Sequence, residues 1–238
     1  MLWNNNPGRL LVIEGLDGSG KATQSELLAR AMEQRGARVR KISFPDYAHR
    51  SSIPVQMYLA GEIGSLDEVN VFAASSFYSI DRYISYRTDW RRDYLGDTLI
   101  IADRYTTSNA CHQMVKLPRE HWDAYLDWLA DFEYSKMELP APDLVIYLDM
   151  DPATSRRLLE KRYGGDGYKR DIHEANLSYL LDCREAALYA AEHWGWRVVR
   201  CCDGSDPFPP EEIHRRVLEA VLPLCRDSRP GEKERENE

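Results

Sequence analysis

The sequence contains no apolar run that approaches the roughly 20 residues needed to cross a membrane as a helix. Its first ten residues, MLWNNNPGRL, also lack the apolar stretch that is typical of a secretory signal peptide. We therefore expect a cytoplasmic protein that has no membrane partner.

Paired cysteines are also missing. The cysteines number five, which is odd, and no two of them have C-x-x-C spacing. This argues against a disulfide framework and against a zinc site. We expect small buried side chains in a reducing compartment. The residues concerned are Cys111, Cys183, Cys201, Cys202 and Cys225.

An excess of positive charge is absent as well. The chain has 31 Lys and Arg residues against 39 Asp and Glu residues, a formal net charge of -8. A nucleic-acid-binding protein normally carries a basic stripe, and none is visible here, so we expect no nucleic-acid partner. Small anionic substrates remain compatible with this balance, because a few focused Arg and Lys side chains can outweigh an acidic surface locally.

Short apolar runs alternate with helical patterns along the chain. The runs predict strands at residues 9–15, 37–45, 96–105, 142–151 and 196–202. Helical patterns cover about 21–36, 67–95 and 121–137. This alternation predicts an α/β fold with a five-stranded parallel sheet and helices on both faces. With 238 residues, 43% of them hydrophobic, we expect one domain over residues 1–226 and a disordered tail at 227–238.

The stretch GLDGSGKATQ, residues 15–24, follows the first predicted strand and opens the first helix. It matches the phosphate-binding pattern G-x-x-x-x-G-K-[ST] at Gly15, Gly20 and Lys21. Ala22 replaces the hydroxyl residue that helps to hold Mg2+ in this pattern. Backbone N–H groups of such a turn form an anion cradle, and the lysine adds a positive charge. A strand, this loop and a helix in succession favour phosphate binding over a purely structural turn.

Two further motifs follow predicted strands, where ligands bind in parallel sheets. Asp103 ends the third strand, in the position of a carboxylate that binds magnesium, and Arg104 would point toward a second phosphate. The alternative is a capping Asp beside a surface Arg. FPDY, residues 44–47, follows the second strand, and its Phe44 and Tyr47 are either core residues or part of a site.

Two other segments carry side chains that suit a nucleotide. In YSIDR, Tyr78 and Arg82 are four residues apart on one helix face, where the ring could stack on a base and the arginine could donate to it. The alternative is a solvated arginine beside a packed aromatic. EKRYGGDGYKRDIHE, residues 160–174, is rich in glycine and basic residues. It is either a polar loop or a mobile lid that closes over transferring phosphates.

Taken in order, these segments resemble the thymidylate kinase family over about residues 9–220. EGLDGSGKATQ is similar to the family loop E-G-x-D/E-G-x-G-K-x-T-Q, and FPDY, YSIDR, ADRYTTSNA and the lid segment look like its other signatures. The resemblance implies a P-loop NTPase fold, a three-layer sandwich with a lid at about 161–172. It implies a kinase that transfers the γ-phosphoryl group of ATP to dTMP, giving dTDP and ADP for dTTP synthesis. Mg2+ as cofactor and a homodimer with an interface between 67 and 95 are implied as well.

The resemblance also implies a role for each matching position. The implied ATP-binding residues are Gly15, Asp17, Gly18, Ser19, Gly20, Lys21, Ala22 and Thr23. The implied dTMP-binding residues are Asp17, Phe44, Pro45, Tyr47, Tyr78, Arg82, Arg104, Ser108, Asn109, His112 and Glu174. The implied catalytic residues are Lys21, Asp103, Arg104, Arg162, Lys169 and Arg170. Asp103 and Glu174 would bind the metal, partly through water.

The implied contact between Arg82 and thymine O4 has a chemical reason. Arginine only donates hydrogen bonds. It therefore suits a carbonyl at this ring position and leaves the amino group of cytosine unsatisfied, which favours discrimination between the two bases.

The chain departs from the family pattern near the acceptor. Asp46 stands where many members carry an arginine, for which Arg50 could substitute. His112 stands where many members carry an aromatic residue associated with excluding a ribose 2′-hydroxyl. Because of these departures, the alternative that the chain is a related nucleoside monophosphate or deoxynucleoside kinase with a different acceptor stays open.

Other departures concern the phosphates. Gly18 stands where some members carry an arginine, so the catalytic positive charge should come from the lid. Ile172 replaces an arginine at the end of the lid. Together with Ala22, this loss keeps open a catalytically weak nucleotide-binding protein.

Overall fold

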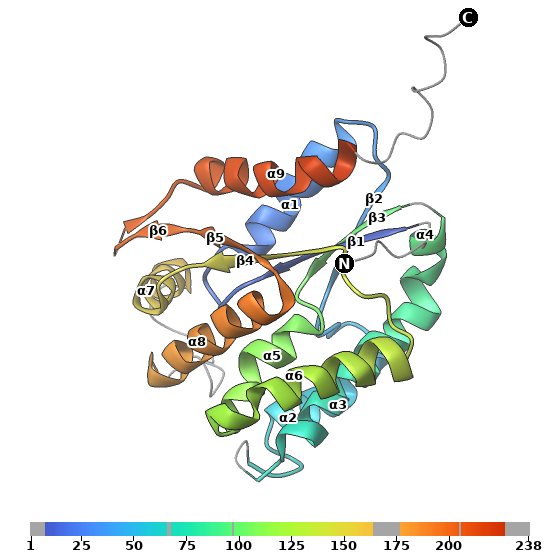
Figure 1. Ribbon diagram of the computed structural model, residues 1–238, viewed down its shortest axis with the longest axis vertical. Helices are drawn as coiled ribbons and strands as arrows, with labels where there is room; N and C mark the ends of the chain where they lie inside the picture. The colour runs from blue at the N-terminus through green and yellow to red at the C-terminus, as the bar shows by residue number, and fades with distance from the viewer. Residues whose placement is uncertain (1–7, 66–67, 97, 164–176, 205, 227–238) are drawn as a thin grey trace, which may run out of the picture.

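The computed structural model describes residues 8–65, 68–96, 98–163, 177–204 and 206–226. At its centre is a five-stranded parallel sheet with the strand order β2-β3-β1-β4-β5 (Figure 1). The strands are β1 (Arg9–Glu14), β2 (Val39–Ser43), β3 (Leu99–Asp103), β4 (Leu144–Asp149) and β5 (Arg197–Arg200). All five predicted strands are confirmed, and each is shorter than its predicted range.

The middle strand, β1, is apolar along almost its whole length. Its sequence RLLVIE is buried from the second residue onward, and Leu11 pairs with Ile101 of β3 and Leu144 of β4. A continuous apolar run is expected for a parallel strand that is covered on both faces. The edge strands β2 (VRKIS) and β5 (RVVR) carry basic residues and are largely half-buried or exposed.

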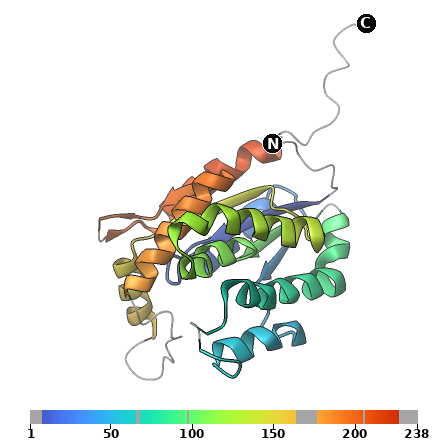
Figure 2. The same ribbon diagram turned by 60° about the horizontal axis from the view of Figure 1, so that its bottom comes forward.

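Helices cover both faces of this sheet, as Figures 1 and 2 show, which confirms the three-layer architecture. On one face, α1 (Lys21–Glu33) and α9 (Pro210–Arg226) pack against a cluster that contains Leu11 and Ile13 of β1. On the other face, Leu10 and Val12 point into a larger, aromatic-rich cluster. Successive side chains of a strand point to opposite faces, so β1 serves both cores. The helices of this second face include α3 (Val71–Ser85), α5 (Thr107–His112), α6 (Trp122–Ala130) and α8 (Leu177–Trp194).

The helical stretches predicted at 67–95 and 121–137 are confirmed, but each contains a wider turn. The π-helical turn η2 (Tyr86–Trp90) links α3 to α4 (Arg91–Leu95), and η5 (Asp131–Lys136) continues α6. The remaining helices are α2 (Ile53–Leu59) and α7 (Pro152–Tyr163). Short 3-10 turns lie at η1 (Arg50–Ser52), η3 (Met114–Lys116) and η4 (Arg119–His121). A two-stranded hairpin of β6 (Cys202–Asp203) and β7 (Asp206–Pro207) was not predicted.

Two predicted segments fall mainly outside the described residues. The lid at 161–172 begins within the last turn of α7, and its residues from 164 onward are not described. The same holds for the predicted tail at 227–238. Within the described ranges, none of the helices is both long and apolar enough to span a bilayer.

Candidate active site

A cavity of about 610 Å³ lies beside the ends of β1, β2 and β3. This is the edge of a parallel sheet where ligands bind. The cavity brings together sixteen of the predicted site residues, which lie far apart in the sequence. They are Asp17, Gly18, Gly20, Lys21, Ala22, Thr23, Phe44, Pro45, Tyr47, Tyr78, Arg82, Asp103, Arg104, Ser108, Asn109 and His112.

The other predicted site residues do not line this cavity or cannot be placed. Gly15 and Ser19 are buried within the phosphate loop, behind its surface. The side chain of Arg162 and all of Lys169, Arg170 and Glu174 lie outside the described residues. Sequence reasoning missed several lining residues, namely Ser43, Leu59, Tyr105, Gln113, Leu158, Leu159, Tyr179 and Leu180.

The phosphate loop needs glycine for two different reasons. At Gly18 the backbone φ is +81°, and a Cβ atom would come within 2.6 Å of the Ser155 carbonyl oxygen and 2.9 Å of Leu159 Cγ. Close packing of α7 therefore leaves no room for a side chain at this position. At Gly20, the N-cap of α1, φ is +95° but a Cβ atom would meet no atom within 4 Å. This open side of the loop leaves room for a bound phosphate at the helix N-terminus.

Lys21 is folded back onto this loop. Its Nζ donates hydrogen bonds to the carbonyl oxygens of Gly15 at 2.9 Å and Leu16 at 3.1 Å, and lies 3.3 Å from Asp17 Oδ1. These contacts hold the ammonium group at the cavity. Ala22 and Thr23 are exposed beside it.

Arg104 directly follows β3, the strand beside β1, and its side chain reaches Asp17 in the phosphate loop that follows β1. Its φ is +69°, a left-handed conformation that is uncommon for a residue with a side chain and recurs at functional sites. The guanidinium group pairs with Asp17 and contacts Ser108 Oγ at 3.3 Å and His112 Nε2 at 3.1 Å. These contacts point the arginine into the cavity, so the alternative of a surface arginine is wrong.

Two carboxylates beside these cations differ in their electrostatics. Burial opposes the ionisation of Asp17, but the charges of Arg104 and Lys21 outweigh it and hold the pKa of Asp17 well below its usual range. Burial raises the pKa of Asp103, and Lys21 and Arg104 counteract only part of this effect. Asp17 is therefore firmly ionised, whereas Asp103 would gain from a nearby cation.

Glu14 is a functional candidate that the sequence analysis missed. It ends β1, is fully buried, and accepts hydrogen bonds from Gly15 N at 2.9 Å, Thr107 Oγ1 at 2.8 Å and Ser108 Oγ at 2.7 Å. Its Oε1 also lies 3.5 Å from Arg104 Nη1. One carboxylate thus joins the phosphate loop, α5 and the cavity arginine. A charged residue at the end of an otherwise apolar strand was the available signal.

The FPDY segment forms one wall of the cavity. Phe44 is buried and packs against Tyr105 with 5.9 Å between ring centroids, whereas Tyr47 is 58% exposed. Both line the cavity, so Phe44 is a core residue and a wall residue at once. The segment is held by buried Asp81, which accepts a hydrogen bond from Asp46 N at 2.9 Å.

The structure does not support the expectation that Arg50 substitutes for the arginine missing at position 46. Arg50 lies on η1, is exposed, and is not part of the described cavity lining.

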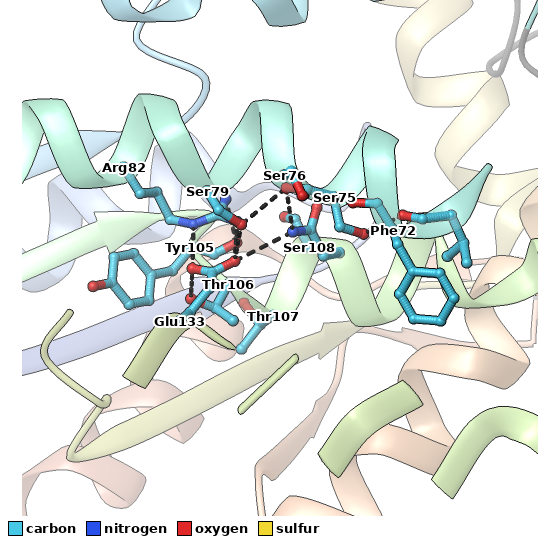
Figure 3. A network of polar contacts seen from close by, with 12 residues as sticks. Phe72, Ser75, Ser76, Ser79, Arg82, Tyr105, Thr106, Thr107, Ser108 and Glu133 are labelled. Carbon is cyan, nitrogen blue, oxygen red and sulfur yellow. Dashed lines mark hydrogen bonds and ion pairs between the residues drawn. The ribbon is translucent and has the colours of Figure 1, made fainter. Parts of the chain in front are cut away.

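Arg82 is held in a buried polar network, shown in Figure 3. It is 1% exposed, and its Nε donates to Glu133 Oε2 at 2.8 Å while Nη2 pairs with Glu133 Oε1. Nη1 lies 3.4 Å from the Tyr105 carbonyl oxygen. The alternative of a solvated arginine is therefore wrong. Tyr78 lies one turn earlier on α3, is half-buried, and meets the ring of Tyr58 edge-on at 6.4 Å.

The described residues could contribute to a magnesium site but do not form one alone. No group of three His, Cys, Asp or Glu side chains within these ranges could hold a metal. Asp103 is half-buried and lines the cavity with Lys21. A single carboxylate that works with substrate phosphates and water is a common way to bind Mg2+, so Asp103 fits this ion.

Comparisons with known proteins agree with this geometry. A thymidylate kinase family model matches residues 13–207. A thymidylate kinase of Mycobacterium tuberculosis is 32% identical over 200 residues, which cover 80% of this chain and 90% of that protein. One from Schizosaccharomyces pombe is 33% identical over 164 residues, 66% of this chain and 70% of that protein.

The fold has a solved counterpart. A thymidylate kinase structure from Candida albicans, described as revealing the origin of broad substrate specificity, superposes with a TM-score of 0.67. It is 21% identical and the match covers 94% of this chain and 96% of that one. The chain therefore belongs to the thymidylate kinase family of ATP-dependent nucleoside monophosphate kinases.

Proposed function

We propose that this chain transfers the γ-phosphoryl group of ATP to dTMP within the described cavity. The observation that carries the proposal is that one cavity contains both ends of such a reaction. Lys21 and the glycine loop lie on one wall, Tyr78 and Arg82 on another, and Arg104 lies among them. A phosphate donor and a nucleotide acceptor can therefore meet in one cavity.

The chemistry requires alignment and neutralisation of charge. Lys21 and the loop N–H groups would hold the ATP phosphates, while Arg104 would hold the acceptor phosphate. The second pKa of a phosphate monoester is about 6, so the attacking oxygen is already largely ionised at neutral pH. No general base is needed, and the ion pairs with Asp17 keep both cations oriented in advance.

When bound, Mg2+ would supply positive charge that offsets the negative charge of the ATP phosphates. Asp103 would contribute to its ligands, with Glu174 completing the set, partly through water. ATP phosphates would supply the ligands that Ala22 lacks. The lid residues Arg162 and Lys169, with Arg170, would add positive charge over the transferring group.

The base would lie between Tyr78 and the Arg82 network. Tyr78 would stack on thymine and Arg82 would donate to its O4. Phe44, Pro45 and Tyr47 would close the acceptor side, with Ser108 and Asn109 along the thymine edge and His112 near the sugar. The fixed orientation of Arg82 supports this assignment, since a pre-organised donor discriminates strongly against a base that also donates.

The test is magnesium-dependent ADP release from ATP with dTMP, dUMP, dCMP, dGMP, UMP and thymidine as acceptors. We expect a strong preference for dTMP. Turnover only with a different acceptor would overturn the assigned base pocket. Tight ATP binding without ADP release for any acceptor would instead identify a nucleotide-binding protein without kinase activity.

We also propose a cytoplasmic homodimer that uses the outer face of α3. Phe72, Ile80 and Tyr83 are 44%, 39% and 37% exposed on this helix, and Phe72 contacts Trp128 of α6 at 4.7 Å between ring centroids. Such an apolar surface suits a second copy of the chain. Four buried free cysteines among the described residues suit a reducing compartment. Sedimentation of the parent and of a Tyr83→Glu variant tests the dimer, which the variant should weaken.

A further inference from the structure

Glu133 is a buried acid on the η5 turn, and the proposed reaction has no evident need for it. It is fully buried, although Asp131, Ser135 and Lys136 of the same turn are exposed. A charge in this position is costly unless hydrogen bonds compensate it. A buried acid at this position therefore requires several hydrogen-bond donors around it.

The two carboxylate oxygens of Glu133 receive hydrogen bonds from three separate parts of the fold. Arg82 and Ser79 donate from α3, the latter to Oε1 at 2.7 Å. Thr106, in the turn after β3, donates to Oε2 at 2.6 Å, and Asn109 of α5 donates to Oε1 at 3.3 Å. Figure 3 shows Ser79, Arg82 and Thr106 converging on this carboxylate. Because it only accepts, every group facing it must present a donor.

The carboxylate of Glu133 fixes the orientation of the Arg82 side chain. The pairing with Nε and Nη2 is bidentate, which sets the plane and direction of the guanidinium group. Arginine has five N–H donors, and Glu133 engages only one edge of the group. Nη1 has its one described contact at 3.4 Å, to the Tyr105 carbonyl oxygen. Donor capacity therefore remains on an arginine that lines the cavity.

The same requirement fixes the amide of Asn109. Its Nδ2 faces two acceptors, Glu133 Oε1 and the Ser75 carbonyl oxygen, both at 3.3 Å. The reverse orientation would place Oδ1 against two oxygens. Nδ2 is thereby committed to the network, and Oδ1 is the amide atom left for the cavity that Asn109 lines.

We propose that Glu133 is a positioning residue that sets the hydrogen-bonding polarity of the base pocket. Through one carboxylate it fixes the direction in which Arg82 donates and makes Asn109 an acceptor toward the ligand. This pair complements a ring edge in which a carbonyl lies next to an N–H group, as in thymine and uracil. Cytosine presents an amino donor and a bare ring nitrogen there, so it opposes both groups. The inference rests on the proposed function, because it assumes that a nucleotide base occupies this part of the cavity.

Glu133→Gln is the direct test. The amide keeps one oxygen for Arg82 but supplies an NH2 group, which allows Asn109 to reverse and present Nδ2 to the ligand. The probes are dUMP and dCMP, which differ only at the ring edge in question, with dTMP measured alongside. We expect the ratio of kcat/KM for dUMP over dCMP to fall by about 10- to 100-fold, the effect of one mispaired buried polar group. The control is Glu138→Gln on the exposed Glu138 nearby, which should leave the ratio unchanged.

A second variant separates positioning from a general loss of packing. Glu133→Gln combined with Asn109→Asp exchanges the acid and the amide, so residue 133 donates and residue 109 again presents an acceptor to the cavity. The other carboxylate oxygen of Asp would face the Ser75 carbonyl oxygen, which loses its donor, so we expect this double variant to recover part of the dUMP preference. It also decides the matter if Glu133→Gln alone does not fold.

The outcomes are distinguishable. A Glu133→Gln protein that is slower with all acceptors but keeps the parent ratio would overturn the inference, as would a double variant with no recovered preference. A parent enzyme that uses dTMP but does not prefer dUMP over dCMP would also overturn it. A parent that uses no nucleotide acceptor would instead refute the proposed function itself.

Discussion

Replacing Glu14 by glutamine should loosen both the phosphate loop and the acceptor side of the site. The parent carboxylate accepts from Gly15 N, Thr107 Oγ1 and Ser108 Oγ at 2.7–2.9 Å, while Oε1 lies 3.5 Å from Arg104 Nη1. An amide has one accepting oxygen. If that oxygen faces Gly15 and Arg104, its NH2 group meets the two hydroxyl groups, and the reverse orientation places NH2 against two donors.

The structure sets the size of the expected effect. Hydrogen bonds to a charged group contribute about 1.5–3 kcal/mol each, and the hydroxyl groups can turn to accept, so we expect a net loss of about 2 kcal/mol in unfolding free energy. For a chain of this length, that corresponds to a decrease of about 4–8 °C in Tm. Arg104 also loses one of its two ion-pair partners, Glu14 and Asp17, and the support of Ser108, so KM for dTMP should rise about tenfold.

The assay combines thermal unfolding with initial rates of ADP release over a dTMP series at saturating ATP. Glu26→Gln is the matched control, because Glu26 makes only exposed ion pairs with Arg30 and Lys41. It should change neither Tm nor KM appreciably. A Glu14→Gln protein that behaves like this control would refute the view that the buried charge organises the site.

Three further predictions concern the same cavity. Asp103→Asn should lower turnover at saturating ATP and Mg2+ by at least about 100-fold, and a rate near that of the parent would contradict its role at the metal. Asp17 has a lowered pKa, so its stabilising effect should be complete above about pH 4 and be lost as the pH falls below this value. The unfolding free energy, measured in urea from pH 5 to pH 2, should therefore fall less steeply for Asp17→Asn than for the parent. Gly18→Ala should reduce Tm and ATP affinity more than Gly36→Ala. Both glycines have positive φ, but only at Gly18 would a Cβ atom come against Ser155. Equal effects of the two substitutions would show that α7 moves to accommodate the added methyl group.

Most of the fold could be predicted because the three central strands, β3, β1 and β4, are compact apolar runs. RLLVIE and LVIYLD are buried in the sheet, and their lengths leave little doubt about strand or helix. The β6–β7 hairpin was missed because each of its strands has two residues, too few to show alternation. The π-helical turns were missed because a single wider turn hardly changes the helical pattern.

The site could be predicted where the motif and the strand end coincide, as at Lys21, Asp103 and Arg104. Its supporting acids were harder to recognise because their partners are remote in sequence. Glu133 follows Trp122, Leu126 and Leu129 at helical spacing, so it falls on the buried face of α6 and η5. A charge on an apolar face must find a partner, yet the sequence alone does not reveal that Arg82, 51 positions away, is that partner.

The central claim is that a phosphoryl group passes from ATP to dTMP in this cavity. The most direct measurement follows γ-radiolabelled ATP with the purified protein, Mg2+ and dTMP, and separates the labelled products. We predict that the label appears in dTDP at the rate at which ADP forms, and that dTDP labelling is lost when dTMP is omitted. Label found only in inorganic phosphate, or retained in ATP, would contradict the claim.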